Sequence, residues 1–419
     1  MNRLDLLKYD LVSILIYIGL VSFGIINIYS SSFNGSSTNL FDVSSIVGKQ
    51  IIFFFLSLVV LIFILFTRNK FFDNSASIVY FLSIILLIGL FFFGVERGGA
   101  KSWYALGPIS FQPSELSKFG TALFLSKFLS IIQTDLKKKR DIVIVLIIIL
   151  IPLILTTIQP DPGSALIFLA FIFPVIREGL NLNYFYFGLY IISTLLITLK
   201  FNFLICLTIL TIIFFAYLIY LRNKKIKVSL LKFIFSFFIL ISTSLSTNYL
   251  FENVLEQRHR DRINLVLGKE VDKSGIGYNI SQSKIAISNG RFFGTGFLEG
   301  TQTKGNFVPR QHTDFIFSTI GEEWGFIGSL TTIVLFSFLI IRIITRANKQ
   351  PNHFRRIYTY CFASLVFFHF FLNVGMSIGL LPSIGIPLPF VSYGGSSLLI
   401  FSLMFFVYIN FDSSRLKES

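Results

Sequence analysis

The chain has 419 residues, of which 54% are hydrophobic and 14% are charged, and its mean hydropathy is +0.76. This composition excludes a soluble or disordered protein and indicates an all-α protein that crosses a membrane many times. The formal net charge is +15. Its basic residues lie between apolar runs, so membrane orientation and anionic lipid explain the charge, and no nucleic-acid partner is expected.

A bilayer core of roughly 30 Å needs about 20 apolar helical residues to cross it. Runs of this kind predict spans at 10–30, 50–67, 76–95, 114–132, 141–158, 163–177, 184–199, 202–221, 229–250, 320–342, 357–381 and 391–411. The polar break near residue 201 is short, so 184–221 is either a hairpin or one kinked element, and we expect 10–12 spans. The whole chain, 1–419, is predicted to be a single integral membrane domain.

Basic residues gather in alternate loops, which predicts that both termini are cytoplasmic. The basic clusters lie at 68–70, 137–140, 177, 222–227, 342–356 and 415–417. The loops at 31–49, 96–112, 159–162, 251–312 and 382–390 then share the outer face. Most of these outer loops are rich in glycine, proline and polar residues, so we expect the function to be extracytoplasmic.

The outer segment 98–118 leads into a predicted helix. Pro113 suits the first turn of that helix and places Glu115 and Lys118 three residues apart on one face. At mid-bilayer, a charge facing lipid costs about 2.5–3.5 kcal/mol, so both side chains should face the bundle interior or a wet cavity. They form either an internal ion pair that fixes helix packing or a site where Lys118 meets an anionic ligand.

Two further outer segments contain helix-breaking residues. Two prolines and a glycine in Gln159–Ala165 require a break, where Asp161 either caps the next helix or shares in an active cavity. The segment Gly379–Ser397 contains too much glycine and proline to be helical throughout. Irregular backbone at membrane depth is tolerated only against protein or a water-filled cavity, so we expect this segment to line one.

The longest outer loop, 251–312, contains the main candidates for chemistry. Arg258 and Arg262 share a face if their segment is helical, where they suit phosphate, although a solvated run of charges explains them too. Asp272 precedes two glycines that allow a tight turn, and a carboxylate there can accept the proton of an attacking hydroxyl. His312 is a second candidate base or a structural residue.

Several common signatures are missing from the sequence. It contains no Walker-type phosphate loop, no paired cysteines at zinc spacing and no His-Glu-x-x-His motif. We therefore expect no nucleotide cofactor and no ATP-driven work.

Taken in order, these segments resemble the SEDS family (shape, elongation, division and sporulation proteins) over nearly the full length of the chain. The resemblance rests on residues 98–118, 159–165, 260–263, 272, 275–278, 282–286, 300–303, 312–317 and 379–397. The Gly-Thr-Gln stretch at 300–302 and the short N-terminus favour the rod-shape branch of the family over the division branch.

The resemblance implies a peptidoglycan glycosyltransferase of the bacterial plasma membrane. It would polymerise lipid II, the undecaprenyl-diphosphate-linked disaccharide-pentapeptide, with a class B penicillin-binding protein, a transpeptidase, as its partner. The aspartate that matches Asp272 is essential in the family, which makes Asp272 the candidate catalytic base.

The other candidate site residues would bind substrate. Arg260, Arg262 and Lys118 would stabilise the departing diphosphate, with or without a divalent cation such as Mg or Mn. The remaining candidates are Glu115, Gln282, Tyr278, Lys101, Asp161, His312 and Asp314.

The sequence departs from the family pattern at several places. Ser102 stands where an arginine usually precedes the tryptophan, so Lys101 is the candidate for that charge. Arg310 replaces a commonly acidic residue, and Lys273 replaces a proline that often follows the essential aspartate. Family members commonly have ten spans, so 184–221 is predicted to be an additional hairpin. A lipid II transporter and a noncatalytic scaffold are the alternative functions.

Overall fold

The computed structural model describes residues 9–33, 45–97, 99–107, 109–131, 133–201, 203–223, 230–253, 257, 260, 261, 264, 267 and 276–418. The chain forms two compact units. One consists of Met1–Leu180 and Asn279–Ser419, and the other of Asn181–Tyr278. Asp272 lies outside the described residues.

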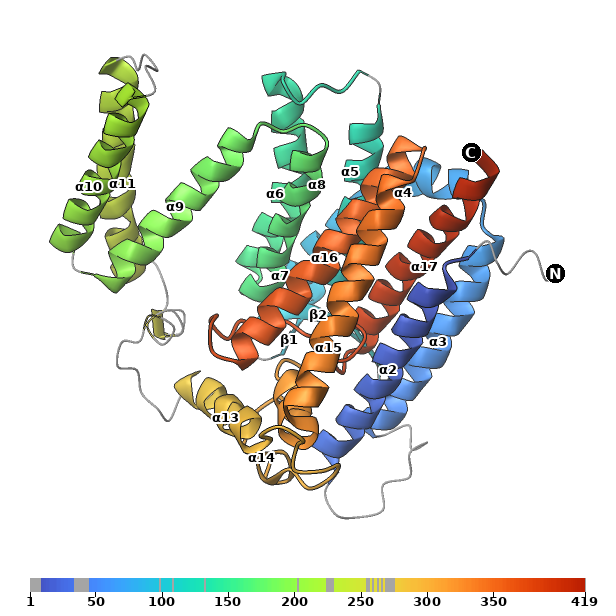
Figure 1. The fold of residues 1–419 in the computed structure, drawn as a ribbon. Coiled ribbons are helices and arrows are strands. Elements are labelled where there is room, and N and C mark those ends of the chain that lie inside the picture. The colour runs from blue at the N-terminus through green and yellow to red at the C-terminus, as the bar shows by residue number, and fades with distance from the viewer. Residues whose placement is uncertain are drawn as a thin grey trace. The chain divides into compact units, whose positions relative to one another are not determined.

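The first unit is a bundle of helices (Figure 1). It contains α2 (Leu11–Ser32), α3 (Ile46–Phe66), α4 (Asn69–Phe93), α5 (Pro113–Ser130), α6 (Lys139–Ile158), α7 (Pro162–Ile167), the 3-10 helix η1 (Phe168–Phe171), α8 (Ile172–Arg177), α14 (Thr301–Lys304), α15 (Ile316–Asn348), α16 (His353–Ser377), α17 (Gly395–Glu418) and most of α13 (Ile276–Asn289). The second unit contains α9 (Leu182–Lys200), α10 (Phe203–Asn223) and α11 (Leu230–Asn253), which pack on one another.

The predicted class, an all-α multi-pass membrane protein, is confirmed. In the described part of the chain, eight helices are long and apolar enough to cross a membrane, namely α2, α3, α4, α6, α9, α15, α16 and α17. Helix α5 has 18 residues but contains Glu115, Lys118 and Lys127, and the 162–177 series is shorter than a usual span. The count of 10–12 spans stays a prediction.

The centre of the first unit is formed by α16 and α17. About two thirds of the apolar stretch of α16 (67%) and 78% of that of α17 are buried by other elements, against 17% for α3. Aromatic rings fill this centre, as where Tyr17 stacks on Phe405 with ring centroids 4.9 Å apart. The helices around them expose leucine, isoleucine and phenylalanine, which suits a surface that faces lipid.

A small antiparallel sheet, which was not predicted from the sequence, forms at residues 95–111. Its strands are β1 (Val95–Arg97), β2 (Ala100–Leu106) and β3 (Ile109–Phe111), in that order. Gly99 and Gly107 lie in the two connections and have φ angles of +84° and +63°, which other residues rarely adopt. Strands this short carry too little alternation to be recognised in a sequence.

Helix α15 contains a break at Gly325, where φ is +63° and ψ is −155°. The loop that follows α13 occupies the break and forms hydrogen bonds with the backbone of α15. The N–H of Phe326 donates to the carbonyl of Arg291, and the N–H of Thr295 donates to the carbonyl of Glu322, both at 2.9 Å. The predicted span at 320–342 is therefore not one uninterrupted helix, because a loop replaces the missing helical hydrogen bonds.

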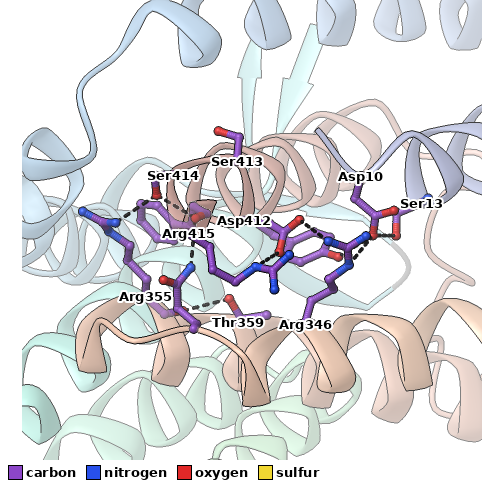
Figure 2. Close-up of polar contacts among 12 residues, drawn as sticks. Asp10, Ser13, Arg346, Arg355, Thr359, Asp412, Ser413, Ser414 and Arg415 are labelled. Carbon is purple, nitrogen blue, oxygen red and sulfur yellow. Dashed lines mark hydrogen bonds and ion pairs between the residues drawn. The ribbon is translucent and has the colours of Figure 1, made fainter. Parts of the chain in front are cut away.

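Helices α2, α15 and α17 are tied together at one end of the bundle (Figure 2). The guanidinium of Arg342 donates to both oxygens of Asp10 at 2.6–2.9 Å. The hydroxyl of Tyr408 donates to Asp10 at 3.1 Å, and Arg346 lies between Asp10 and Asp412 at 3.6 and 3.2 Å. We call these five residues the Asp10 network. It places the start of α2 and the end of α17 at the same end of the first unit.

Candidate active site

Loops assigned to the outer face meet at the end of the first unit opposite the Asp10 network (Figure 1). The side-chain amide of Gln112 donates to Asp161 at 3.0 Å, which joins the 96–112 and 159–162 loops. The N–H of Tyr393 donates to the carbonyl of His312 at 2.8 Å, which joins the 379–394 segment to the residues before α15. Segments that are far apart in the sequence thus form one polar end of the bundle.

A buried charged pair lies beneath this end. The ammonium of Lys118 donates to Glu115 Oε1 at 2.7 Å, and neither side chain is more than 3% exposed. Lys118 Nζ also lies 3.1 Å from His369 Nε2, and His369 Nδ1 lies 3.1 Å from the carbonyl oxygen of Pro387. The expectation that both charges face the interior is confirmed, and they form an internal ion pair. A ligand at Lys118 stays a prediction.

Asp161 caps α7, which is one of the two roles predicted for it. Its Oδ1 accepts from the N–H of Ser164 at 3.1 Å, and its Oδ2 accepts from the Ser164 hydroxyl at 2.8 Å and from the Gln112 amide. Gln112 directly precedes Pro113, the first residue of α5. Asp161 therefore links the starts of α5 and α7. Its share in an active cavity stays a prediction.

His312 and Asp314 lie just before α15. Burial lowers the pKa of His312 below its ordinary value, so the imidazole is neutral at pH 7 and has a lone pair that can accept a proton. Its ring meets that of Tyr393 edge to face, with centroids 5.9 Å apart. Asp314 pairs with Arg310 at 3.4 Å, and because the Arg310 side chain is 57% exposed, this ion pair contributes little to stability.

The 379–394 segment is irregular, as predicted, and buried amides hold it. The Gln50 side chain donates to the carbonyl of Ser392 at 3.3 Å and accepts from the N–H of Gly394 at 3.2 Å. The Asn373 amide donates to the carbonyl of Ile386 at 2.8 Å. These contacts place the segment against protein and supply the hydrogen bonds that its irregular backbone needs.

Glu322 fixes the Gly-Thr-Gln stretch to α15. Its two carboxylate oxygens accept from the N–H groups of Gln302 and Thr303, each at 2.8 Å, and the Thr303 hydroxyl donates at 2.7 Å. A carboxylate in this position satisfies N–H groups that the short helix α14 leaves unpaired. The stretch therefore has a defined place on the bundle.

Other predicted site residues are not brought together by the described structure. Asp272 and Arg262 lie outside the described residues. Arg260 belongs to the second unit and donates to the carbonyl of Glu252 at 3.0 Å. Tyr278 and Gln282 are half-buried in α13, and the Lys101 ammonium donates to the carbonyl of Phe91 at the end of α4, at 2.8 Å. Their roles toward substrate stay predictions.

A metal site is not apparent among the described residues. None of them form a group of three or more His, Cys, Asp or Glu side chains that could hold an ion. The carboxylates of the half-buried Asp161 and the buried Glu322 already accept hydrogen bonds from N–H and O–H groups, so they do not suit a cation. A divalent cation with Asp272 stays a prediction.

Two buried polar residues of α16 were not among the predicted site residues. His369 and Asn373 lie four residues apart, on one face of a helix that is otherwise largely apolar. A polar or ionisable side chain within a membrane span is by default a candidate functional residue. That signal was present in the sequence, but nothing local identified the partners of His369, which are Pro387 and Lys118.

Comparison with known proteins identifies the family. The family model for FtsW, RodA and SpoVE, described as a cell cycle protein, matches residues 10–207 and 183–416. Peptidoglycan glycosyltransferase MrdB of Escherichia coli (strain K12) is 30% identical over 346 residues, which cover 82% of this chain and 79% of the relative. Peptidoglycan glycosyltransferase RodA of Treponema pallidum (strain Nichols) is 30% identical over 420 residues, which cover 93% and 94%.

Solved structures have the same fold. A chain from a peptidoglycan synthase complex superposes with a TM-score of 0.70 at 24% identity, covering 97% of this chain and 98% of that one. Thermus thermophilus rod shape determining protein RodA superposes with a TM-score of 0.61 at 21% identity, covering 97% of both. Because the family model and relatives of 30% identity span most of its length, the chain belongs to the FtsW/RodA/SpoVE family, as the motifs predicted.

Proposed function

We propose that the chain is a peptidoglycan glycosyltransferase that polymerises lipid II into glycan strands during cell-wall elongation. The observation that carries this proposal is the family membership, because relatives of 30% identity over most of both chains are named peptidoglycan glycosyltransferases. The chain lies in the bacterial plasma membrane with cytoplasmic termini. Its active site faces outward.

The reaction joins an acceptor sugar hydroxyl to the anomeric carbon of a donor. The new oxygen–carbon bond forms as the bond from that carbon to the lipid diphosphate breaks, and direct displacement inverts the anomeric centre. The acceptor hydroxyl must lose a proton as it attacks, and Asp272 accepts it as general base. The departing group is the undecaprenyl diphosphate.

Negative charge on the departing diphosphate requires positively charged neighbours. Arg260 and Arg262 are suited to this role because guanidinium groups bind phosphate oxygens through paired hydrogen bonds. Lys118 has its charge already compensated by Glu115 at 2.7 Å. Its contribution is therefore a directed hydrogen bond more than a net positive charge.

A transpeptidase partner is part of the same proposal. The family resemblance implies a class B penicillin-binding protein, which would cross-link the strands as they are made and activate the polymerase. This expectation is tested by co-purification of the chain with its transpeptidase and by comparing polymerisation with and without it.

Polymerisation of labelled lipid II by the purified chain, alone or with the transpeptidase, tests the function. The wild-type protein should produce long glycan, and Asp272→Ala should abolish it. Glu299→Gln, which changes an exposed carboxylate of the same outer loop, should polymerise normally.

A second assay separates the enzyme from a transporter. Lipid II movement is measured in vesicles that contain the same variants. Movement across the bilayer without glycan synthesis, unaffected by Asp272→Ala, would support the transporter instead. A scaffold predicts that cells with Asp272→Ala keep both partner recruitment and normal shape.

A further inference from the structure

A line of contacts joins the 379–394 segment to the buried charged pair. It runs from the carbonyl of Pro387 to His369 of α16 at 3.1 Å, then to Lys118 of α5 at 3.1 Å, and ends at Glu115 at 2.7 Å. The four residues come from three separate parts of the chain. His369 is 1% exposed, and Phe401 packs edge to face against its ring with centroids 4.8 Å apart.

The contacts determine which nitrogen of His369 carries the proton. A carbonyl oxygen only accepts hydrogen bonds, so Nδ1 must be protonated to donate to Pro387. The ammonium of Lys118 only donates, so Nε2 must offer its lone pair. A neutral ring protonated at Nδ1 satisfies both contacts, whereas a doubly protonated ring would direct an N–H at the ammonium of Lys118.

His369 restricts an otherwise adaptable side chain. Lysine has a flexible four-carbon stem, and a single ion pair with Glu115 leaves the ammonium free to rotate. With the second contact, to Nε2 of His369, two of the three N–H bonds of the Lys118 ammonium have fixed directions. Within the described structure, Glu115 Oε2 is buried without a hydrogen-bond partner. The pair therefore retains one N–H and one carboxylate oxygen that can meet a further polar group.

We propose that His369 is a positioning residue for the glycosyltransferase reaction. It holds the Lys118 ammonium at a fixed orientation, and the Pro387 carbonyl in turn holds His369. This inference rests on the proposed function, because it assigns His369 a role only through a lysine that serves catalysis. The 379–394 segment is thereby connected to the charged pair by hydrogen bonds and not only by packing.

Three substitutions of purified protein test this role by lipid II polymerisation. His369→Phe keeps a ring but offers no acceptor, and a misplacement of Lys118 by about 1 Å should lower kcat by about a hundredfold while KM changes little. His369→Gln can accept from Lys118 and donate to Pro387, so it should recover most of the lost rate. The control is His353→Phe, which replaces an exposed histidine at the start of the same helix and should leave the kinetics at wild-type values.

A double-mutant cycle separates positioning from a general packing role. If His369 acts through Lys118, then adding His369→Phe to Lys118→Met should cause almost no further loss of kcat. Equal losses in both backgrounds would overturn the inference, and so would a His369→Phe enzyme with wild-type kcat. If His369→Phe fails to fold, His369→Leu, which also offers no acceptor to Lys118, takes its place in both backgrounds.

Asp272→Ala, assayed beside these variants, distinguishes this inference from the proposed function. Inactive Asp272→Ala with a fully active His369→Phe refutes the positioning role and leaves the proposed function standing. Fully active Asp272→Ala refutes the proposed mechanism, whatever His369→Phe does.

Discussion

Asp10 shows how strongly one buried charge can depend on its neighbours. The residue is 1% exposed, and its carboxylate also accepts from the Ser13 hydroxyl at 2.7 Å, in addition to the contacts from Arg342 and Tyr408. A buried carboxylate is costly unless such partners surround it. The contacts also span most of the sequence, since Asp10 and Tyr408 are 398 residues apart.

Removal of this charge should destabilise the protein. Asp10→Asn leaves Arg342 without its carboxylate, and because Arg342 is a quarter exposed and can turn to water, we expect a loss of about 2–3 kcal/mol. Thermal unfolding in detergent measures the effect. Glu96→Gln, at an exposed carboxylate of β1, is the control. Equal midpoints for the two variants would contradict the role given to the Asp10 network.

His312 should make stability depend on pH. Its pKa is lower in the folded protein than the value of 6.5 expected without burial. The unfolded chain therefore binds more protons, and stability is fully present above about pH 6.5 and falls as the pH drops toward the folded pKa.

The test compares unfolding midpoints at pH 8 and pH 5. The wild-type protein should lose stability on acidification, and His312→Gln should lose less, because it removes the group that resists protonation. An identical pH dependence in both proteins would show that His312 is not buried as a neutral base.

At the scale of elements, helices were predictable and their interruptions were not. A helix or a short series of helices covers most of every predicted apolar run, because a membrane span must satisfy its backbone internally. The break at Gly325 depends instead on a loop more than 30 residues earlier in the sequence, near Gly290 and Gly294. A glycine within an apolar helix gives no local sign of such a partner.

Gly325→Ala should disrupt α15. The φ angle of +63° disfavours alanine, and a Cβ would lie 2.3 Å from the N–H nitrogen of Gly294. Strain and overpacking together should cost about 3 kcal/mol. Gly188→Ala is the matched control because nothing lies within 4 Å of its Cβ position in α9. Unfolding midpoints decide the prediction, which fails if Gly325→Ala is as stable as Gly188→Ala.

For the whole molecule, the sequence determines the fold class more completely than it determines the candidate site. Hydropathy and loop composition predicted a multi-pass helical protein with polar loops at one end. Local chemistry correctly predicted the interior pair Glu115–Lys118 and the cap at Asp161. His369 escaped prediction because Lys118 lies 251 residues away, and such a contact depends on the fold.

The rate of glycan strand synthesis by purified Asp272→Asn tests the central claim most directly. The asparagine preserves size but cannot take a proton, so the rate should fall about a hundredfold or more relative to wild type. A rate equal to wild type, with product of normal length, would contradict the claim that this carboxylate accepts the proton in strand growth.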